Sequence, residues 1–126
     1  MIKVLPIQSK LRQEEICIKC GVEYDADLLA YAVSVDDRLS GICQFKLTDK
    51  GGVIYDIAAT TDHYDADALF VMGRGALNFI DLCGVHYATY VGSGAEDSLL
   101  NKIGFKKNSD GVYEIDLNGF FTDHCH

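Results

Sequence analysis

The chain of 126 residues has no tryptophan, a single proline and no long hydrophobic run. No apolar stretch approaches the roughly 18 residues that a membrane-spanning helix needs, and residues 1–4 lack the apolar core of a signal peptide. Basic residues are scarce too, because 11 Lys and Arg stand against 19 Asp and Glu, a net charge of -8. A negative field repels nucleic-acid phosphates and anionic lipid headgroups. We therefore expect a cytoplasmic protein that binds neither nucleic acid nor membranes.

The rest of the composition is that of an ordinary globular protein, with 48% hydrophobic and 24% charged residues. A chain of this length usually forms one domain, so we expect a single domain over 1–126. The five cysteines are an odd number, which favours free thiols over a disulfide framework. Cys17 and Cys20, with His124-Cys125-His126, have the ligand types of a zinc site. Because the second group lies at the chain end, we predict no metal site.

The spacing of hydrophobic and turn residues predicts alternating strands and helices. Their order, strand, helix, three strands, helix, strand, helix and two strands, predicts an α/β fold with a mixed central sheet and helices on both faces. Asp49-Lys50-Gly51-Gly52 predicts a turn before the fourth strand. The expected strands cover 2–7, 29–35, 39–47, 53–60, 87–91, 105–107 and 112–117, and the expected helices cover 10–20, 66–83 and 96–103.

The residues that close the second and third predicted helices resemble those of a known family. Gly84 ends the long helix, and Leu99-Leu100-Asn101-Lys102-Ile103-Gly104-Phe105 ends the short one. With the order of elements, they resemble the GNAT superfamily of acyl-CoA-dependent N-acyltransferases over residues 2–117. The resemblance implies a GNAT-like fold and transfer of an acyl group from acetyl-CoA to an amine of a small molecule or peptide. It also implies that homodimers are common.

The resemblance further implies where acyl-CoA would lie. In this fold the fourth strand, here 53–60, separates from the fifth, here 87–91. The pantetheine arm would pair in the gap with the backbone of Ile57, Ala58 and Ala59.

The loop before the long helix would hold the CoA pyrophosphate at the positive end of the helix dipole. The family motif of arginine or glutamine followed by two small residues falls on Tyr64, Asp67 and Leu69, and all three positions differ. Asp65 and Asp67 place carboxylates where the anion would sit, so we expect weak CoA binding. Ser93 stands where the family often has an asparagine near the pantetheine.

The catalytic positions also depart from the family. The tyrosine that protonates the leaving thiolate in many members corresponds to Leu100, which has no proton to donate. Tyr90 or Cys83 could act as the acid instead, and Asp56 in the fourth strand could act as the general base. The alternative for Tyr90 and Cys83 is core packing, and for Asp56 it is simple exposure to solvent.

Two functions therefore stay open. The first is an N-acetyltransferase whose acceptor amine is cationic, because the chain is acidic and Asp56, Asp62, Asp65 and Asp67 are expected around the cleft. The alternative is a catalytically inactive GNAT-fold binding or interaction module that has lost the CoA binding of the family. The altered phosphate loop and Leu100 favour this alternative.

Two adjacent aromatic residues, Phe120 and Phe121, follow the last predicted strand. Burying one such side chain stabilises a protein by about 1.5 to 3 kcal/mol, so we expect both to be packed. They would pack on the sheet of their own chain or on the partner in a homodimer, and we predict the homodimer.

Overall fold

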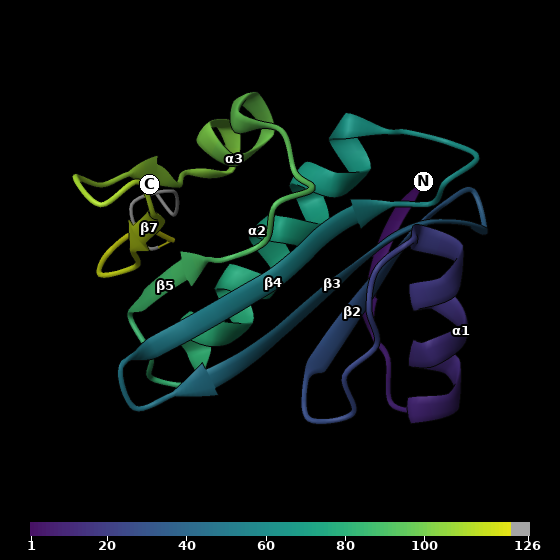
Figure 1. Cartoon of the computed structure of the whole chain (residues 1–126), viewed down its shortest axis with the longest axis horizontal. Helices are drawn as coiled ribbons and strands as arrows, with labels where there is room; N and C mark the ends of the chain where they lie inside the picture. The colour runs from purple at the N-terminus through teal and green to yellow at the C-terminus, as the bar shows by residue number, and fades with distance from the viewer. Residues whose placement is uncertain (122–126) are drawn as a thin grey trace.

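Within residues 1–121, which the computed structural model describes, seven strands form one sheet in the order β1-β2-β3-β4-β5-β7-β6. The pairing of β4 with β5 is parallel and all other pairs are antiparallel. The predicted order of elements and the mixed sheet are confirmed (Figure 1). The elements are β1 (Ile2–Pro6), α1 (Lys10–Cys20), β2 (Leu29–Val35), β3 (Arg38–Thr48), β4 (Gly51–Ala59), α2 (Ala66–Leu82), β5 (Tyr87–Tyr90), α3 (Asp97–Ile103), β6 (Lys106–Lys107) and β7 (Tyr113–Asp116).

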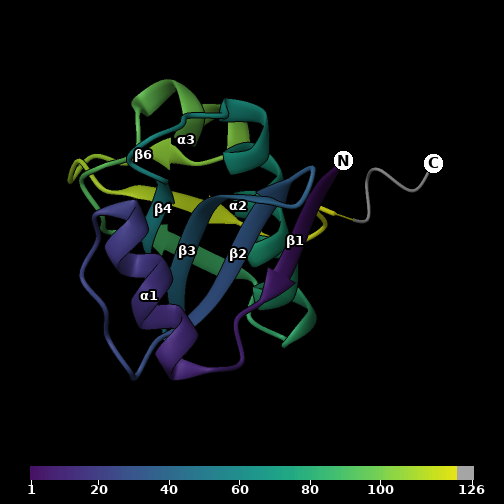
Figure 2. The same cartoon turned by 90° about the vertical axis from the view of Figure 1, so that its right-hand side faces the viewer.

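The helices lie on both faces of the sheet, as the order of elements predicts. Figure 2 shows α1 on one face of the sheet and α2 on the other. Helix α1 begins at Ser9, whose hydroxyl accepts a hydrogen bond from the Arg12 amide at 3.2 Å, and ends at Gly21, whose φ of 67° suits glycine. None of the helices among residues 1–121 is long and apolar enough to cross a membrane.

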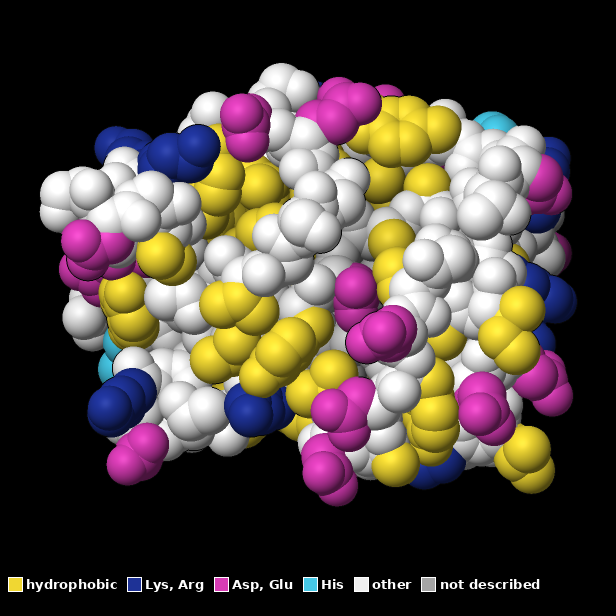
Figure 3. Space-filling model, in the orientation of Figure 1, with side chains coloured by type: hydrophobic (Ala, Val, Ile, Leu, Met, Phe, Trp, Pro, Cys, Tyr) yellow, Lys and Arg dark blue, Asp and Glu magenta, His cyan; other side chains and the backbone are white. Residues whose placement is uncertain are grey.

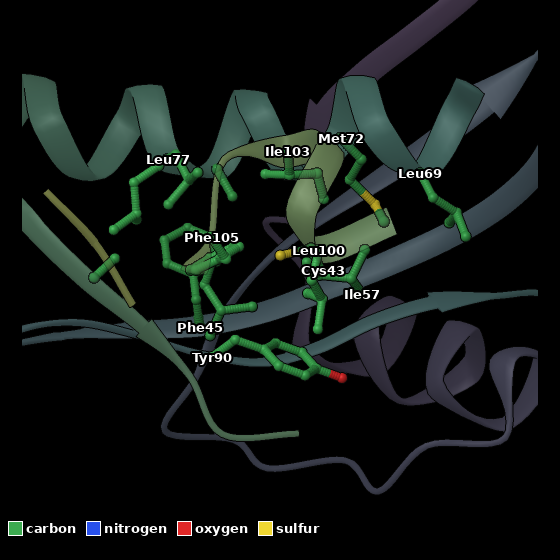
Figure 4. Packing of buried hydrophobic residues seen from close by; sticks show 14 of the residues in the cluster. Cys43, Phe45, Ile57, Leu69, Met72, Leu77, Tyr90, Leu100, Ile103 and Phe105 are labelled. Carbon is green, nitrogen blue, oxygen red and sulfur yellow. The ribbon is translucent and has the colours of Figure 1, made fainter. Parts of the chain in front are cut away.

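Two hydrophobic cores hold these layers together. The larger core lies between the sheet and helices α2 and α3 (Figure 4), and the smaller lies under α1 and contains Cys17 and Cys20. Gly52 lets α2 approach the sheet closely, because a Cβ at this position would lie 2.8 Å from Ile80 Cδ1. The four cysteines among the described residues are free, as predicted, and burial raises the pKa of Cys17 to about 11. Residues 124–126, the other half of the considered zinc site, lie outside the described part of the chain.

The fourth strand contains a bulge that the sequence pattern did not predict. Gln44 of β3 pairs with Asp56 and Phe45 pairs with Ile54, so Tyr55 is an extra residue in β4. Neighbouring side chains on a regular strand point to opposite faces, and an extra residue breaks this alternation. Tyr55 and Asp56 consequently line the same cavity on the α1 side of the sheet.

The parallel pairing of β4 with β5 is short. It consists of Gly52 with Ala88, Val53 with Thr89 and Ile54 with Tyr90, and it ends where the bulge begins. Strand β4 continues beyond this point to Ala59 and pairs there with β3. The predicted separation of the fourth and fifth strands is therefore present.

The two phenylalanines after β7 pack on their own chain. Phe120 and Phe121 contact each other edge to face, with ring centroids 4.9 Å apart, and both pack against the larger core. The guanidinium of Arg74 lies 4.9 Å from the centre of the Phe120 ring, and its Nε donates to the carbonyl of Ile103 at 2.6 Å. Of the two packing arrangements considered, the intramolecular one accounts for both rings, and the homodimer stays a prediction.

Candidate active site

A cavity of about 580 Å³ lies on the α1 side of β4, where the parallel pairing ends. Its walls come from the loop between α1 and β2 and from the bulge in β4. Figure 3 shows acidic side chains gathered near the middle of the face that carries α1, next to hydrophobic ones. The lining residues are Glu23, Tyr24, Asp25, Ala26, Leu28, Tyr55 and Asp56.

Asp56 is the lining residue best suited to accept a proton. Its carboxylate is half-buried, and its Oδ2 accepts a hydrogen bond from Gln44 Nε2 at 2.7 Å. Burial raises the pKa of Asp56 and the charge of Glu23 raises it further, while the hydrogen bond from Gln44 opposes both effects. A raised pKa brings a carboxylate closer to the range in which a general base works near neutral pH.

Tyr90, the predicted acid, lies at the end of β5 beside Leu100 and Phe105 (Figure 4). Only 5% of Tyr90 is exposed, and its Oη accepts a hydrogen bond from the Ala95 amide at 3.1 Å. Accepting this bond leaves the phenolic proton available for donation. Burial is the largest cause that raises the pKa of Tyr90, and the negative charge of Asp56 adds to it.

A second cavity, of about 400 Å³, lies next to Tyr90 between the segment after β5 and the β6–β7 hairpin. Its lining includes Leu100 and Ser93, which stand where the family often has a tyrosine and an asparagine, and Tyr90, the predicted replacement acid. The structure therefore brings these three positions together. Leu100 itself is 1% exposed and packed in the larger core.

Gly92 lets the chain after β5 pass directly against the bulge. A Cβ at Gly92 would overlap the Tyr55 carbonyl oxygen and would lie 2.6 Å from Tyr90 Oη. A Cβ atom essentially never lies this close to another heavy atom, so only glycine fits this crossing.

The predicted pantetheine positions follow the bulge. Ile57, Ala58 and Ala59 pair with β3 on one side, and among residues 1–121 no strand pairs with them on the other. Ile57 points into the larger core, whereas Ala58 and Ala59 are partly exposed. The free backbone edge fits an extended amide chain such as pantetheine.

The start of α2 fits a pyrophosphate less well than the free edge of β4 fits a pantetheine arm. Asp65 caps the helix, because its Oδ1 accepts a hydrogen bond from the Ala68 amide at 3.1 Å. Asp67 lies 3.8 Å from Lys102 Nζ, which partly neutralises it. Tyr64 is exposed beside them, but the Leu69 side chain is buried and its amide bonds to the Asp65 carbonyl, so Leu69 has no group left for a ligand.

The acidic residues predicted around one cleft are dispersed. Asp62 pairs with Arg38 at 3.4 Å in a separate surface cavity, and Asp65 and Asp67 lie at the start of α2. Only Asp56 lines the large cavity, where Glu23 and Asp25 supply the other carboxylates. Glu23 and Asp25 were not predicted, because they lie in the α1–β2 loop and no local pattern indicates that this loop shares a cavity with β4.

Comparison with solved structures shows which known proteins share this fold. No family model and no curated protein sequence matches the chain. Its structure is similar to a ribosomal-protein alanine N-acetyltransferase of Escherichia coli, with a TM-score of 0.69 and 10% identity over 93% of this chain and 94% of the other. It is also similar to a protein assigned to the GNAT family as an acetyltransferase from Desulfovibrio desulfuricans, with a TM-score of 0.69 and 13% identity over 93% and 99% of the two chains.

A third similar structure contains bound coenzyme A. The PaiA N-acetyltransferase of Thermoplasma acidophilum, in complex with coenzyme A, has a TM-score of 0.67 and 12% identity over 92% of this chain and 99% of its own. In each case the likeness extends over nearly the whole of both chains. The chain described here therefore has the fold of the GNAT acetyltransferases.

Proposed function

We propose that the protein transfers an acyl group from acyl-CoA, with acetyl-CoA as the donor, to an amine. The observation that carries this proposal is the bulge in β4. It places the Asp56 carboxylate in a large cavity at the point where β4 and β5 separate. The fold supports the proposal, and so does the raised pKa of Asp56, because acyl transfer to an ammonium ion requires its deprotonation first.

Each of two residues would move one proton. Acyl-CoA would supply a thioester, whose carbonyl carbon forms a bond to the amine nitrogen as the bond to sulfur breaks. Asp56 would accept the proton that the ammonium loses, and Tyr90 would donate its phenolic proton to the departing thiolate. Ile57, Ala58, Ala59 and Ser93 would hold the pantetheine arm.

The acceptor proposed here is a small cationic amine, of the polyamine kind, or the amine of a basic peptide. The cavity that Asp56 lines contains two further carboxylates, Glu23 and Asp25, and the rings of Tyr24 and Tyr55. Carboxylates and aromatic faces both attract ammonium groups. The net charge of -8 supports the same class of substrate.

The test combines binding with turnover. Thermal unfolding is measured with acetyl-CoA and with S-acetylpantetheine, which lacks the nucleotide and pyrophosphate. Saturation at 100 times the dissociation constant stabilises a protein by about 2.7 kcal/mol. We expect stabilisation by both compounds and acetylation of cationic amines that Asp56→Asn abolishes. If neither compound at millimolar concentration shifts the melting temperature, the proposed activity is wrong.

A second candidate function, a GNAT-fold binding module without catalysis, is favoured by the start of α2. The Asp65 carboxylate accepts a hydrogen bond from the Ala68 amide, which would otherwise be free to bind an anion. Leu100 stands where the family has a tyrosine. This candidate predicts that acetyl-CoA does not stabilise the protein and that no acetyl group is transferred to any amine. Mass spectrometry of amine acceptors after overnight incubation separates the two functions.

A further inference from the structure

Two glutamine side chains are completely buried between α1 and the sheet, one from each. Gln13 of α1 and Gln44 of β3 are each 0% exposed. Gln13 Nε2 donates a hydrogen bond to Gln44 Oε1 at 2.9 Å. Gln44 Nε2 in turn donates to Asp56 Oδ2 and to the carbonyl oxygen of Glu23, both at 2.7 Å. A buried amide that makes all of these bonds holds its neighbours in one arrangement.

The direction of this chain of hydrogen bonds is fixed by its ends. A carboxylate and a backbone carbonyl only accept, so the amino group of Gln44 must face Asp56 and Glu23. The Lys10 ammonium only donates, and it bonds to Gln13 Oε1 at 3.1 Å. Turning either amide over would bring two acceptors or two donors together. The bonds therefore run from Lys10 through both glutamines to Asp56.

We propose that Gln44 is the positioning residue of Asp56: it fixes the carboxylate toward the cavity, keeps it in the proton-accepting form, and links it to the α1–β2 loop through the Glu23 carbonyl. This inference rests on the proposed function for its catalytic meaning. Gln44 does not line the cavity, so it acts on the substrate only through Asp56. The loop that it holds carries the other walls of the same cavity.

The electrostatic surroundings of Asp56 determine whether the loss of the Gln44 hydrogen bond raises or lowers the Asp56 pKa. Burial and the charge of Glu23 raise the pKa of Asp56, and the hydrogen bond from Gln44 lowers it. Burial raises the pKa of Cys17 to about 11 and that of Cys20 to about 12, so both thiols stay protonated while Asp56 titrates. The ionisable groups around Asp56 are Cys17 and Cys20 of α1, Glu23, Tyr24 and Asp25 of the α1–β2 loop, Cys43 and Lys46 of β3, Tyr55 of β4, Tyr90 of β5 and, through the glutamines, Lys10.

A direct readout is the titration of the Asp56 carboxyl carbon by NMR, which does not depend on any activity. Gln44→Leu removes the donor, so we expect the Asp56 pKa to rise. Gln44→Glu places a second carboxyl against Asp56, and we expect a larger rise because the two groups must share a proton. Gln8→Leu removes an exposed amide outside the chain of bonds and is the matched control. An Asp56 titration that is the same in wild type and both Gln44 variants overturns the inference.

If the Gln44 variants do not fold, Gln13→Met provides the second test. It removes the partner of Gln44 Oε1 and keeps the bond to Asp56, so we expect a smaller rise of the same sign. An unchanged Asp56 titration in a folded Gln13→Met protein overturns the inference as well.

The kinetic consequence is specific to a positioning role. In Gln44→Leu we expect kcat to fall about tenfold, which is less than the roughly 10²- to 10⁴-fold that general-base catalysis contributes because Asp56 itself remains, with an unchanged KM for acetyl-CoA. The acid side of the pH profile should move to higher pH, in step with the NMR titration. If the NMR titration shows a shifted Asp56 pKa but the pH profile of kcat is unchanged, the claim that Gln44 acts on catalysis through Asp56 is contradicted. A wild-type protein that acetylates no amine refutes the proposed function, and the NMR titration still decides whether Gln44 controls Asp56.

Discussion

Replacing Asp65 by asparagine removes a negative charge from the start of α2 and keeps the helix cap. The Asp65 Oδ1 atom accepts from the Ala68 amide at 3.1 Å, and an asparagine Oδ1 can accept the same bond. Asparagine and aspartate are about equally good capping residues, so the helix should lose only a few tenths of a kcal/mol from its dipole interaction. The variant therefore isolates the effect of the charge on anion binding.

The size of that effect follows from Coulomb's law. Two unit charges about 4 Å apart repel by about 1 kcal/mol in water and by about 4 kcal/mol at an effective dielectric constant near 20. Asp65 is partly exposed, so the lower figure applies. We expect Asp65→Asn to bind CoA about fivefold more tightly for each phosphate charge close to the helix start.

Isothermal titration with CoA at low and high salt measures this directly. The gain should shrink at high salt, where exposed charges are screened. Asp49→Asn is the matched control, because it removes the same charge from the exposed β3–β4 turn. Equal CoA affinities for wild type and Asp65→Asn, or an equal gain in Asp49→Asn, would refute the reasoning about the start of α2.

Four further outcomes are expected. Asp56→Asn should raise the melting temperature at pH 8 and leave it unchanged near pH 3, because a pKa raised in the folded state makes wild type lose stability as pH rises through it; differential scanning fluorimetry across pH measures this. Gly92→Ala should lower the unfolding free energy by about 1 to 3 kcal/mol in urea titrations, because its Cβ would clash with the Tyr55 carbonyl. The control for Gly92→Ala is Gly94→Ala, whose Cβ would meet nothing within 4 Å and which should leave the unfolding free energy nearly unchanged. Leu100→Ala should remove about 2 to 5 kcal/mol in the same assay, as expected for a fully buried leucine. Sedimentation velocity of the full chain should show a dimer of the 13.9 kDa protein, and a monomer at all concentrations would contradict the homodimer.

Local sequence patterns were enough to predict most of the fold. The long helix expected over 66–83 spans Ala66–Leu82, because its apolar residues repeat at helical spacing and Asp65 caps it. The turn predicted at Gly51 and Gly52 is instead the start of β4. A Cβ at Gly51 would lie 2.8 Å from the Tyr87 ring, so this strand needs glycine for a contact that is distant in sequence.

The candidate site was predictable only in part. Asp56 and Tyr90 were predicted because each can exchange a proton and they lie on the fourth and fifth strands, between which the family resemblance places acyl-CoA. The side on which Asp56 lies depends on the bulge at Tyr55, which is a property of the register with β3. The role of Gln44 depends on a partner 31 residues away in sequence, Gln13, and no local pattern reports it.

The short junction between β4 and β5 also bears on how the chain folds. Strands β1 to β4 form an antiparallel half whose neighbours in the sheet are mostly neighbours in sequence. Among residues 1–121, the strands of the other half pair with it only at Gly52–Ala88, Val53–Thr89 and Ile54–Tyr90, and each pair closes a loop that contains the whole of α2. Long loops are slow to close, so we expect the first half to assemble before the second docks on it. The line along which the strands separate is then also the boundary between two steps of folding.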